Sequence, residues 1–173
     1  MNDTLFEWLV LLCIITHIIR AIYEVMKHKK VIQASKLSFI IIFLDMFLLW
    51  TTWFILCRLD KSVLSLPAAI NYFGIALVII GLVIFLTALF TIKTLETYQG
   101  GLITKGIYSK IRHPMYLGFV LWLIGMPVFC GGMYSMILAV PFIMNVLFWR
   151  HLEEIELVNR FPEYESYKRK TFF

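Results

Sequence analysis

Long apolar runs are the feature that most restricts how this chain can fold. Hydrophobic residues make up 61% of the 173 residues and charged residues only 16%, and the mean hydropathy is +0.84. A soluble domain is nearer half apolar and a quarter charged, so we expect an integral membrane protein. A helix needs about 20 apolar residues to cross a hydrocarbon core of roughly 30 Å. Runs near this length predict spans at Leu5–Met26, Leu37–Cys57, Ala68–Ile92, Met115–Cys130 and Met133–Trp149.

The predicted fold is therefore all-α, a single membrane-embedded bundle of five transmembrane helices. Only Gly131 and Gly132 separate spans four and five, which predicts a tight helical hairpin. The fourth span is short and contains Pro127, so we expect it to be bent or buried against its neighbours. The tail from Arg150 is predicted to be an amphipathic cytosolic helix that breaks near Pro162. Most of the five tryptophans lie near predicted helix ends, a position that favours the water interface.

The distribution of positive charge predicts the orientation in the membrane. Most lysines and arginines fall in the loop after the first span, in the loop that begins at Lys93, and in the tail, whereas the opposite side holds Arg58 and Lys61. The positive-inside rule then places the N-terminus outside and the C-terminus in the cytoplasm. The first residues are acidic and lack a cleavage site, so we expect the first helix to be retained. With no extra N-terminal spans in view, we expect a prokaryotic cell membrane.

The net charge of +5 does not indicate nucleic-acid binding, because the basic residues cluster where membrane topology requires them. Cys13, Cys57 and Cys130 show no CxxC motif or metal-ligand spacing, and their odd number disfavours a disulfide framework. We therefore expect neither a metal site nor a nucleic-acid partner.

Two polar segments lie on the predicted cytoplasmic side and could converge. The first is GIYSKIRHPMYLG at 106–118, just before and within the start of the fourth span, and the second is RHLEE at 150–154. A cationic cluster beside tyrosines at a membrane boundary can hold a charged ligand. The alternative is structural: Pro114 is common at a helix start, and Arg150 with Glu154 at i,i+4 can be a solvated pair.

Ionisable residues inside the predicted spans are costly and are often functional. Asp45 could be protonated, pair with a polar neighbour, or lie close to the site. Arg20 and Glu24 stand at i,i+4 with His17 on the same side, and form either a packed polar patch or a contact to a substrate.

The ordered set of motifs from residue 101 to the end resembles the isoprenylcysteine carboxyl methyltransferase family, with its phospholipid methyltransferase group. The set comprises the segment at 106–118, the Glu-Glu pair at 153–154 and FPEYESY at 161–167. The resemblance implies that S-adenosyl-L-methionine binds at the cytoplasmic face inside a helical bundle. It implies methyl transfer to a lipid or lipidated acceptor that enters from the bilayer, most simply the carboxylate of a prenylcysteine-like substrate. The alternative acceptor is a phospholipid amine.

The resemblance also implies roles for particular residues. Residues 93–173 would form the cofactor-binding half, after three transmembrane helices in 1–92. The implied cofactor-binding residues are Leu102, Ile103, Tyr108, Arg112, His113, Pro114, Met115, Tyr116, Glu153 and Glu154. Arg150 and Glu154 would be the catalytic pair, with the arginine facing the acceptor, although an alignment of the tail favours Glu153 over Glu154. Gly100 stands where the family usually has a histidine, which bears on the identity of the acceptor.

Chemistry independently fits this assignment. A glutamate can satisfy the ammonium of the cofactor, His113 or Arg112 its carboxylate, and a tyrosine ring its adenine. Gly118, Gly125 and Gly74 could open gaps for a lipid tail or allow close packing of helices.

Two rival classes use overlapping features. A sterol-type membrane reductase binds NADPH through a similar Arg-His-Pro-x-Tyr stretch, but commonly has an acidic residue after the motif's glycine, where this chain has Phe119. A non-enzymatic membrane scaffold would use the cationic loops to bind anionic head groups.

Overall fold

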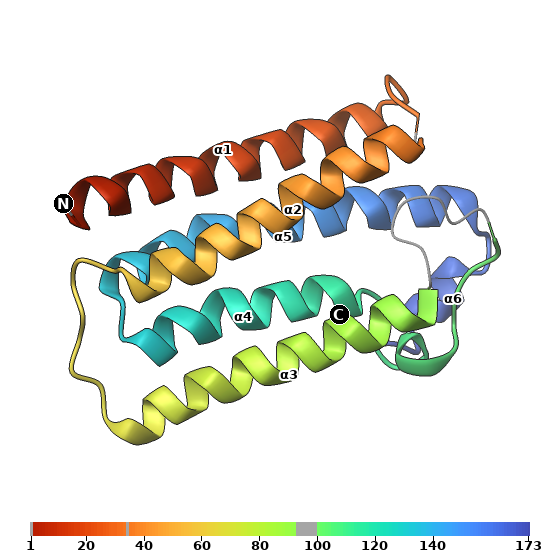
Figure 1. The fold of residues 1–173 in the computed structure, drawn as a ribbon. Helices are drawn as coiled ribbons and strands as arrows, with labels where there is room; N and C mark the ends of the chain where they lie inside the picture. The colour runs from red at the N-terminus through yellow and green to blue at the C-terminus, as the bar shows by residue number, and fades with distance from the viewer. Residues whose placement is uncertain (1, 34, 93–99) are drawn as a thin grey trace.

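The chain forms a bundle of α-helices (Figure 1), and the computed structural model describes residues 2–33, 35–92 and 100–173. The helices are α1 (Asn2–His28), α2 (Lys36–Arg58), α3 (Ala68–Ile92), α4 (Pro114–Cys130), α5 (Met133–Arg160) and α6 (Tyr164–Lys168), with a 3-10 turn, η1 (Gly106–Ser109). Within the described ranges only two isolated bridges pair extended backbone, so the predicted all-α class is confirmed. Lys93 and the start of the predicted cofactor-binding half, at 93–99, lie outside the described residues.

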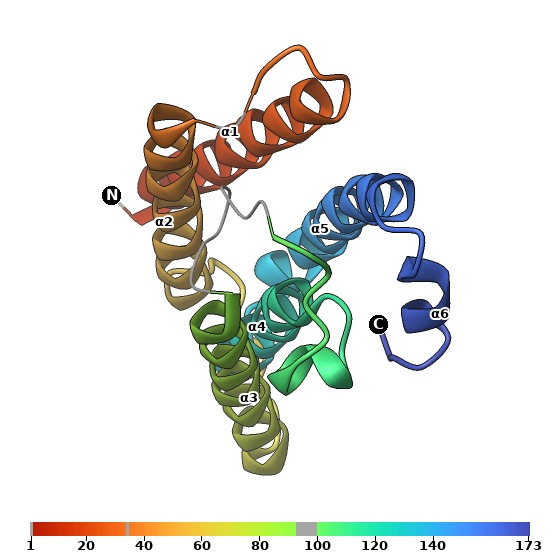
Figure 2. The same ribbon diagram turned by 90° about the vertical axis from the view of Figure 1, so that its right-hand side faces the viewer.

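Among the described residues, four helices are long and apolar enough to cross a membrane: α1 from Thr4, α2, α3 and α5. The helix α4 has 17 residues, fewer than the roughly 20 that a span requires. It lies inside the bundle between α3 and α5 (Figure 2), and its Pro127 is fully buried. The prediction that this short helix is buried against its neighbours is therefore confirmed.

Glycines bring the backbones of α3 and α4 into direct contact. A Cβ added to Gly81 would lie 2.8 Å from the carbonyl oxygen of Gly118, and one added to Gly118 would lie 2.7 Å from that of Gly81. About two helical turns further along α4, a Cβ added to Gly125 would lie 2.6 Å from the carbonyl oxygen of Gly74. These glycines therefore allow close packing of helices, rather than opening gaps for a lipid tail.

A compact junction joins α4 to α5 at the end of the bundle away from α6. The helix α4 stops at Gly131, whose φ of 68° lies in the left-handed region that glycine adopts without strain. Asp60, from the connection between α2 and α3, then caps α5. Its Oδ2 accepts hydrogen bonds from both the backbone N and the Oγ of Ser135, each at 2.7 Å. The carboxylate satisfies donors that a helix start leaves unpaired.

Most of the tryptophans fill the core, so their predicted interfacial position is wrong. Trp53 and Trp149 have no exposed surface and Trp122 is 4% exposed, whereas Trp8 is 63% exposed. Trp149 is buried because α1 packs on α5 here, with the His17 ring 5.5 Å and the Arg20 guanidinium 5.6 Å from its indole. The predicted helix from Arg150 and its break near Pro162 are confirmed, since α5 ends at Arg160.

A polar seam holds α1 against α5. The buried His17 ring stacks on Phe142 with centroids 4.1 Å apart, and Asn145 Nδ2 donates to the His17 carbonyl oxygen at 3.1 Å. One helical turn further along α1, the Arg20 guanidinium lies over the Trp149 ring and pairs with Glu24. This packing directs the polar end of α1 toward the same end of the bundle as α6.

Candidate active site

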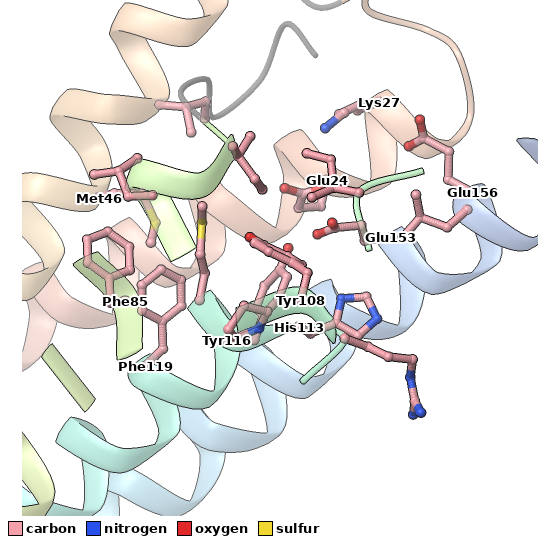
Figure 3. Close-up of a pocket in the computed structure, with 18 of the residues that line it drawn as sticks. Glu24, Lys27, Met46, Phe85, Tyr108, His113, Tyr116, Phe119, Glu153 and Glu156 are labelled. Carbon is pink, nitrogen blue, oxygen red and sulfur yellow. The ribbon is translucent and has the colours of Figure 1, made fainter. Parts of the chain in front are cut away.

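A cavity of about 570 Å³ opens at the end of the bundle where η1, α6 and the polar end of α5 meet. Its volume falls in the range of roughly 300–1,000 Å³ that small-molecule sites occupy. Charged and hydroxyl-bearing side chains gather at one end of the cavity, and Met46, Phe85 and Phe119 line the other (Figure 3). The cavity therefore has a polar compartment that continues into an apolar one.

The start of α4 positions two side chains at the polar end. Gly106 takes a φ of 58° and allows the tight η1 turn, which buries Tyr108. His113 then occupies the N-cap position, and Pro114 supplies the first residue of α4, where a proline costs no hydrogen bond. Tyr108 and His113 thus reach the cavity wall from a short and locally determined stretch of backbone.

A hydrogen bond connects His113 to the tail. Its Nε2 lies 3.2 Å from the hydroxyl of Tyr164 on α6, and both side chains are buried. Burial lowers the pKa of His113 to about 3; the charge of Glu154 opposes this, and the positive charges of Arg150 and Arg112 act with it. The imidazole is therefore neutral at physiological pH and acts as a hydrogen-bonding group rather than as a cation. Burial likewise raises the pKa of Tyr164, which keeps its hydroxyl protonated.

The tail also fastens the loop in front of α4. The Tyr167 hydroxyl donates to the Tyr108 carbonyl oxygen at 2.6 Å. Phe172 pairs with the loop backbone, donating its N–H to the Lys110 carbonyl at 2.8 Å and accepting from the N–H of Arg112 at 3.0 Å. The Arg112 guanidinium completes the attachment, because its Nη1 donates to the carbonyl oxygens of two tail residues at 2.9 and 2.7 Å. The segment 164–173, which we call the tail strap, forms one wall of the site.

Glu154 lies behind this wall, at the centre of three cations. Its carboxylate is 3.1 Å from the Lys168 ammonium, 3.7 Å from the Arg112 guanidinium and 3.9 Å from that of Arg150. The Arg150 guanidinium also lies over the Phe173 ring, 4.8 Å from its centroid. These contacts direct Glu154 and Arg150 toward the tail strap, and neither residue lines the cavity.

Glu153 lies on the other side of α5 and does line the cavity. Its carboxylate faces the Tyr116 hydroxyl, and Glu24 of α1 extends into the same space (Figure 3). Lys27 of α1 is close enough to Glu153 for their charges to interact. The consecutive glutamates therefore face different surroundings, since neighbouring residues on a helix point about 100° apart.

The comparison with known protein families agrees with this architecture. The phospholipid methyltransferase family matches residues 70–163, which is more than half of the chain. The chain belongs to the phospholipid methyltransferase family. The match runs from α3 to the residue before α6, so α1, α2 and the tail strap lie outside it.

Individual relatives of this phospholipid methyltransferase family member are isoprenylcysteine enzymes. The chain is 33% identical over 112 residues to protein-S-isoprenylcysteine O-methyltransferase B of Arabidopsis thaliana, covering 60% of this chain and 51% of the relative. It is 34% identical over 77 residues to the Schizosaccharomyces pombe protein-S-isoprenylcysteine O-methyltransferase, covering 40% and 30%. It is also 34% identical over 117 residues to a probable enzyme of that name from Oryza sativa subsp. indica, covering 59% of each. The matched regions thus span between 30% and 59% of the length of these curated relatives. No solved structure matches it.

These matches confirm the predicted resemblance to the isoprenylcysteine and phospholipid methyltransferases. They favour the methyltransferase hypothesis over the sterol-type reductase. The relatives are plant and fungal proteins, so they give no support to the predicted prokaryotic origin.

The structure brings together most of the residues that the resemblance singled out in this family member. Those that line the cavity are Leu102, Ile103, Tyr108, Arg112, His113, Pro114, Met115, Tyr116 and Glu153. The predicted catalytic pair, Arg150 and Glu154, lies outside the lining. Both Glu153 and Glu154 were candidates to hold the cofactor, and it is Glu153 that lines the cavity.

The motifs did not indicate the full extent of the cavity. Arg20, Glu24 and Lys27 of α1 contribute to its polar end, and aromatic residues of α2 form much of its apolar end. The signal available for α1 was the i, i+4, i+7 spacing of three charges near the end of an apolar helix, which places them on one face. For α2, apolar side chains that line a cavity look the same in sequence as those that face lipid.

Proposed function

We propose that this protein is a membrane methyltransferase that uses S-adenosyl-L-methionine to methylate a lipidated acceptor, most simply the carboxylate of a prenylcysteine-like molecule. The observation that carries the proposal is the two-part cavity. Tyr108, His113 and Glu153 form a polar end suited to a charged, water-soluble group, and the aromatic end is suited to an isoprenoid chain. The names of the curated relatives support the same acceptor class.

The donor set at the polar end fits the proposed cofactor. Glu153 offers a carboxylate to an ammonium group, and the neutral His113 offers a hydrogen bond rather than a charge. The buried rings of Tyr108 and Tyr116 offer aromatic surface to a nucleobase. When bound, S-adenosyl-L-methionine supplies a methyl group on a sulfonium, which transfers as a bond forms to the acceptor oxygen and the bond to sulfur breaks, leaving its electron pair on sulfur.

A carboxylate acceptor is already nucleophilic, so this site needs no general base for it. The task of the residues is to align the acceptor and to exclude water. The tail strap helps to exclude water, since it covers the loop before α4. Hydrogen bonds of Tyr167 and Arg112 hold it there. We assign Arg150 and Glu154 as positioning residues that hold the tail strap, and retain the direct contact of Arg150 with the acceptor as the alternative to be tested.

The lipid part of the acceptor would reach the cavity from the membrane. Phe43 and Phe47 of α2 line the apolar end and are also 50% and 65% exposed, so they border both the cavity and the outer surface of the bundle. An isoprenoid chain could pass at this place while the cofactor enters from the aqueous side. Membrane lipids are the other expected partners.

A second candidate acceptor is a phospholipid amine, because two carboxylates share the polar end. Glu24 and Glu153 extend into the same space, and either could take the proton that an ammonium must lose before it accepts a methyl group (Figure 3).

We also propose five membrane crossings for a single methyltransferase domain, with α4 as the fourth and a tight α4–α5 hairpin at Gly131 and Gly132. The core position of α4 supports this topology, because a helix enclosed by neighbours does not have to match the full lipid thickness. The positive-inside rule then places the N-terminus outside and the tail strap in the cytoplasm.

Binding of S-adenosylhomocysteine to the detergent-purified protein, measured by calorimetry, tests the proposal. Glu153→Gln should weaken binding by about 10-fold or more, since a hydrogen bond to a charged group is worth roughly 1.5–3 kcal/mol. Glu165→Gln, an exposed glutamate of α6, serves as the control and should bind normally. Transfer of a labelled methyl group to a prenylated cysteine would then identify the acceptor. Binding of NADPH instead would support the reductase, and binding of neither would support the scaffold.

A further inference from the structure

The charged face of α1, formed by Arg20, Glu24 and Lys27, lies in the wall of the cavity although α1 is outside the part of the chain that matches the family. The three residues follow the i, i+4, i+7 spacing of a single helix face. Figure 3 shows Glu24 and Lys27 directed into the same space as Glu153. The cavity is therefore not complete without a helix that the family motifs do not include.

Arg20 is a charged group within the apolar helix α1, near its polar end, and its surroundings compensate its charge. The residue is 8% exposed, its guanidinium pairs with Glu24, and it lies over the rings of Tyr23 and Trp149 at 5.5 and 5.6 Å. Charges at such positions are rare and usually mark a ligand or ion pathway. The seam between α1 and α5 also includes the hydrogen bond from Asn145 to His17, so Arg20 is not its only polar contact.

The position of Arg20 coincides with the boundary between the two halves of the cavity. Arg20 and Glu24 lie within electrostatic range of the Tyr116 hydroxyl. The Tyr116 ring packs edge-on against Phe119 at 5.9 Å, and Phe119 packs against Phe85 at 5.5 Å, where the apolar half begins. An amphiphilic molecule with its chain among these aromatic rings would place its head group beside Arg20.

The other cations near the site lie close to carboxylates or to an aromatic ring away from the polar–apolar boundary. Lys27 lines the cavity at its polar end, where its charge interacts with that of Glu153. Arg112, Arg150 and Lys168 surround Glu154 at the tail strap. Arg160 lines the cavity from the last turn of α5, and its guanidinium lies over the Phe161 ring. Among the cationic side chains of the described residues that line the cavity, Arg20 is the one whose charge acts on Tyr116, at the polar–apolar boundary.

We propose that α1 supplies the head-group site for the acceptor, in which Arg20 binds the carboxylate of a lipid-tailed molecule and Glu24 holds Arg20 in position. A guanidinium suits this role because its planar fork can bind both oxygens of a carboxylate at once. The inference rests on the proposed function and extends it, since it names the residue that selects an acidic acceptor.

Calorimetric binding of S-farnesyl-N-acetylcysteine and of its methyl ester to the purified protein, without cofactor, tests this site. The wild type should bind the free acid more tightly than the ester. Arg20→Gln should lower the affinity for the acid by about 10- to 100-fold, leave the ester unaffected, and so remove the preference. Arg20→Lys should restore part of it. The matched control is Arg58→Gln. Arg58 is exposed at the C-terminal end of α2 and does not line the cavity, so this variant should retain the full preference.

The double variant Arg20→Gln/Glu24→Gln separates recognition from folding, because it removes both charges and leaves neither buried alone. It should unfold at a temperature near that of the wild type and still show no preference for the acid. The proposal is overturned if Arg20→Gln keeps the preference, if Arg150→Gln removes it instead, or if the wild type does not prefer the acid. Binding of S-adenosylhomocysteine by the wild type in parallel reports on the proposed function itself, so that failure of one is distinguishable from failure of the other.

Discussion

The imidazole of His113 and the hydroxyl of Tyr164 lie 3.2 Å apart across the wall of the cavity, although 51 positions separate the two residues in the sequence. This hydrogen bond joins the first turn of the helix at the centre of the bundle to the tail strap. Because both side chains are buried, neither can exchange the lost bond for one to water. The wall of the site therefore depends on the tail being in place.

Tyr164→Phe removes this hydrogen bond and keeps the ring. We expect a loss of about 1–3 kcal/mol in unfolding free energy, the usual result when a buried partner is left unsatisfied. Thermal unfolding in detergent, followed by near-ultraviolet circular dichroism, measures the change. The exposed Tyr72→Phe on α3 should have no effect, and an equal loss in both variants would contradict the assignment.

The neutral state of His113 predicts a specific dependence of stability on pH. The pKa of the folded-state imidazole is lowered to about 3 from an ordinary value of 6.5, so between these values the unfolded chain binds a proton that the folded protein does not. His113 therefore reduces stability as the pH falls from 6.5 toward 3. At pH 5 the reduction should be about 2 kcal/mol, from 1.36 kcal/mol per pH unit.

His113→Asn should accordingly show a smaller loss of stability between pH 7 and pH 5 than the wild type, even if it is less stable at pH 7. The exposed His151→Asn is the control and should follow the wild-type curve. Parallel curves for wild type and His113→Asn would show that the imidazole has the same pKa in the folded and the unfolded protein.

The two consecutive glutamates should have separable functions. Glu154→Gln removes the charge that holds Lys168, Arg112 and Arg150, so we expect faster hydrogen exchange in residues 164–173, by several-fold, together with weakened ligand binding. Glu153→Gln should weaken binding of S-adenosylhomocysteine without changing exchange in the tail strap. Hydrogen–deuterium exchange with mass spectrometry distinguishes the two, and identical profiles would refute the division.

A side chain at the glycine contacts of α3 and α4 should destabilise the bundle. Gly118→Leu forces the helices apart, because even its Cβ would lie 2.7 Å from the Gly81 carbonyl oxygen. We expect a loss of about 1–3 kcal/mol or a failure to fold, as overpacking of a close contact produces. Gly101→Leu, at a position where an added Cβ meets nothing within 4 Å, is the control for the same substitution in open space. Equal thermal stability of the two variants would show that the backbones do not touch.

The sequence by itself determined the class of fold and the local structure at the start of α4. Apolar runs longer than a bilayer requires leave few alternatives to a helical bundle, and the order of Gly106, His113 and Pro114 specifies a turn, a cap and a helix start. The family was also recognisable, because its motifs lie in short, ordered segments that include these backbone features.

Only the tertiary structure decided how the charges are distributed around the site. Glu153 and Glu154 are chemically identical neighbours, and it is the packing of α1 and the tail strap on opposite sides of α5 that directs one into the cavity and the other into a group of cations. Likewise, the same i,i+4 spacing pairs Arg20 with Glu24 and Arg150 with Glu154. In the structure the first pair lines the cavity and the second does not. The physical reason is that helical periodicity specifies which residues share a face, whereas the partner that covers this face depends on contacts between segments far apart in the chain.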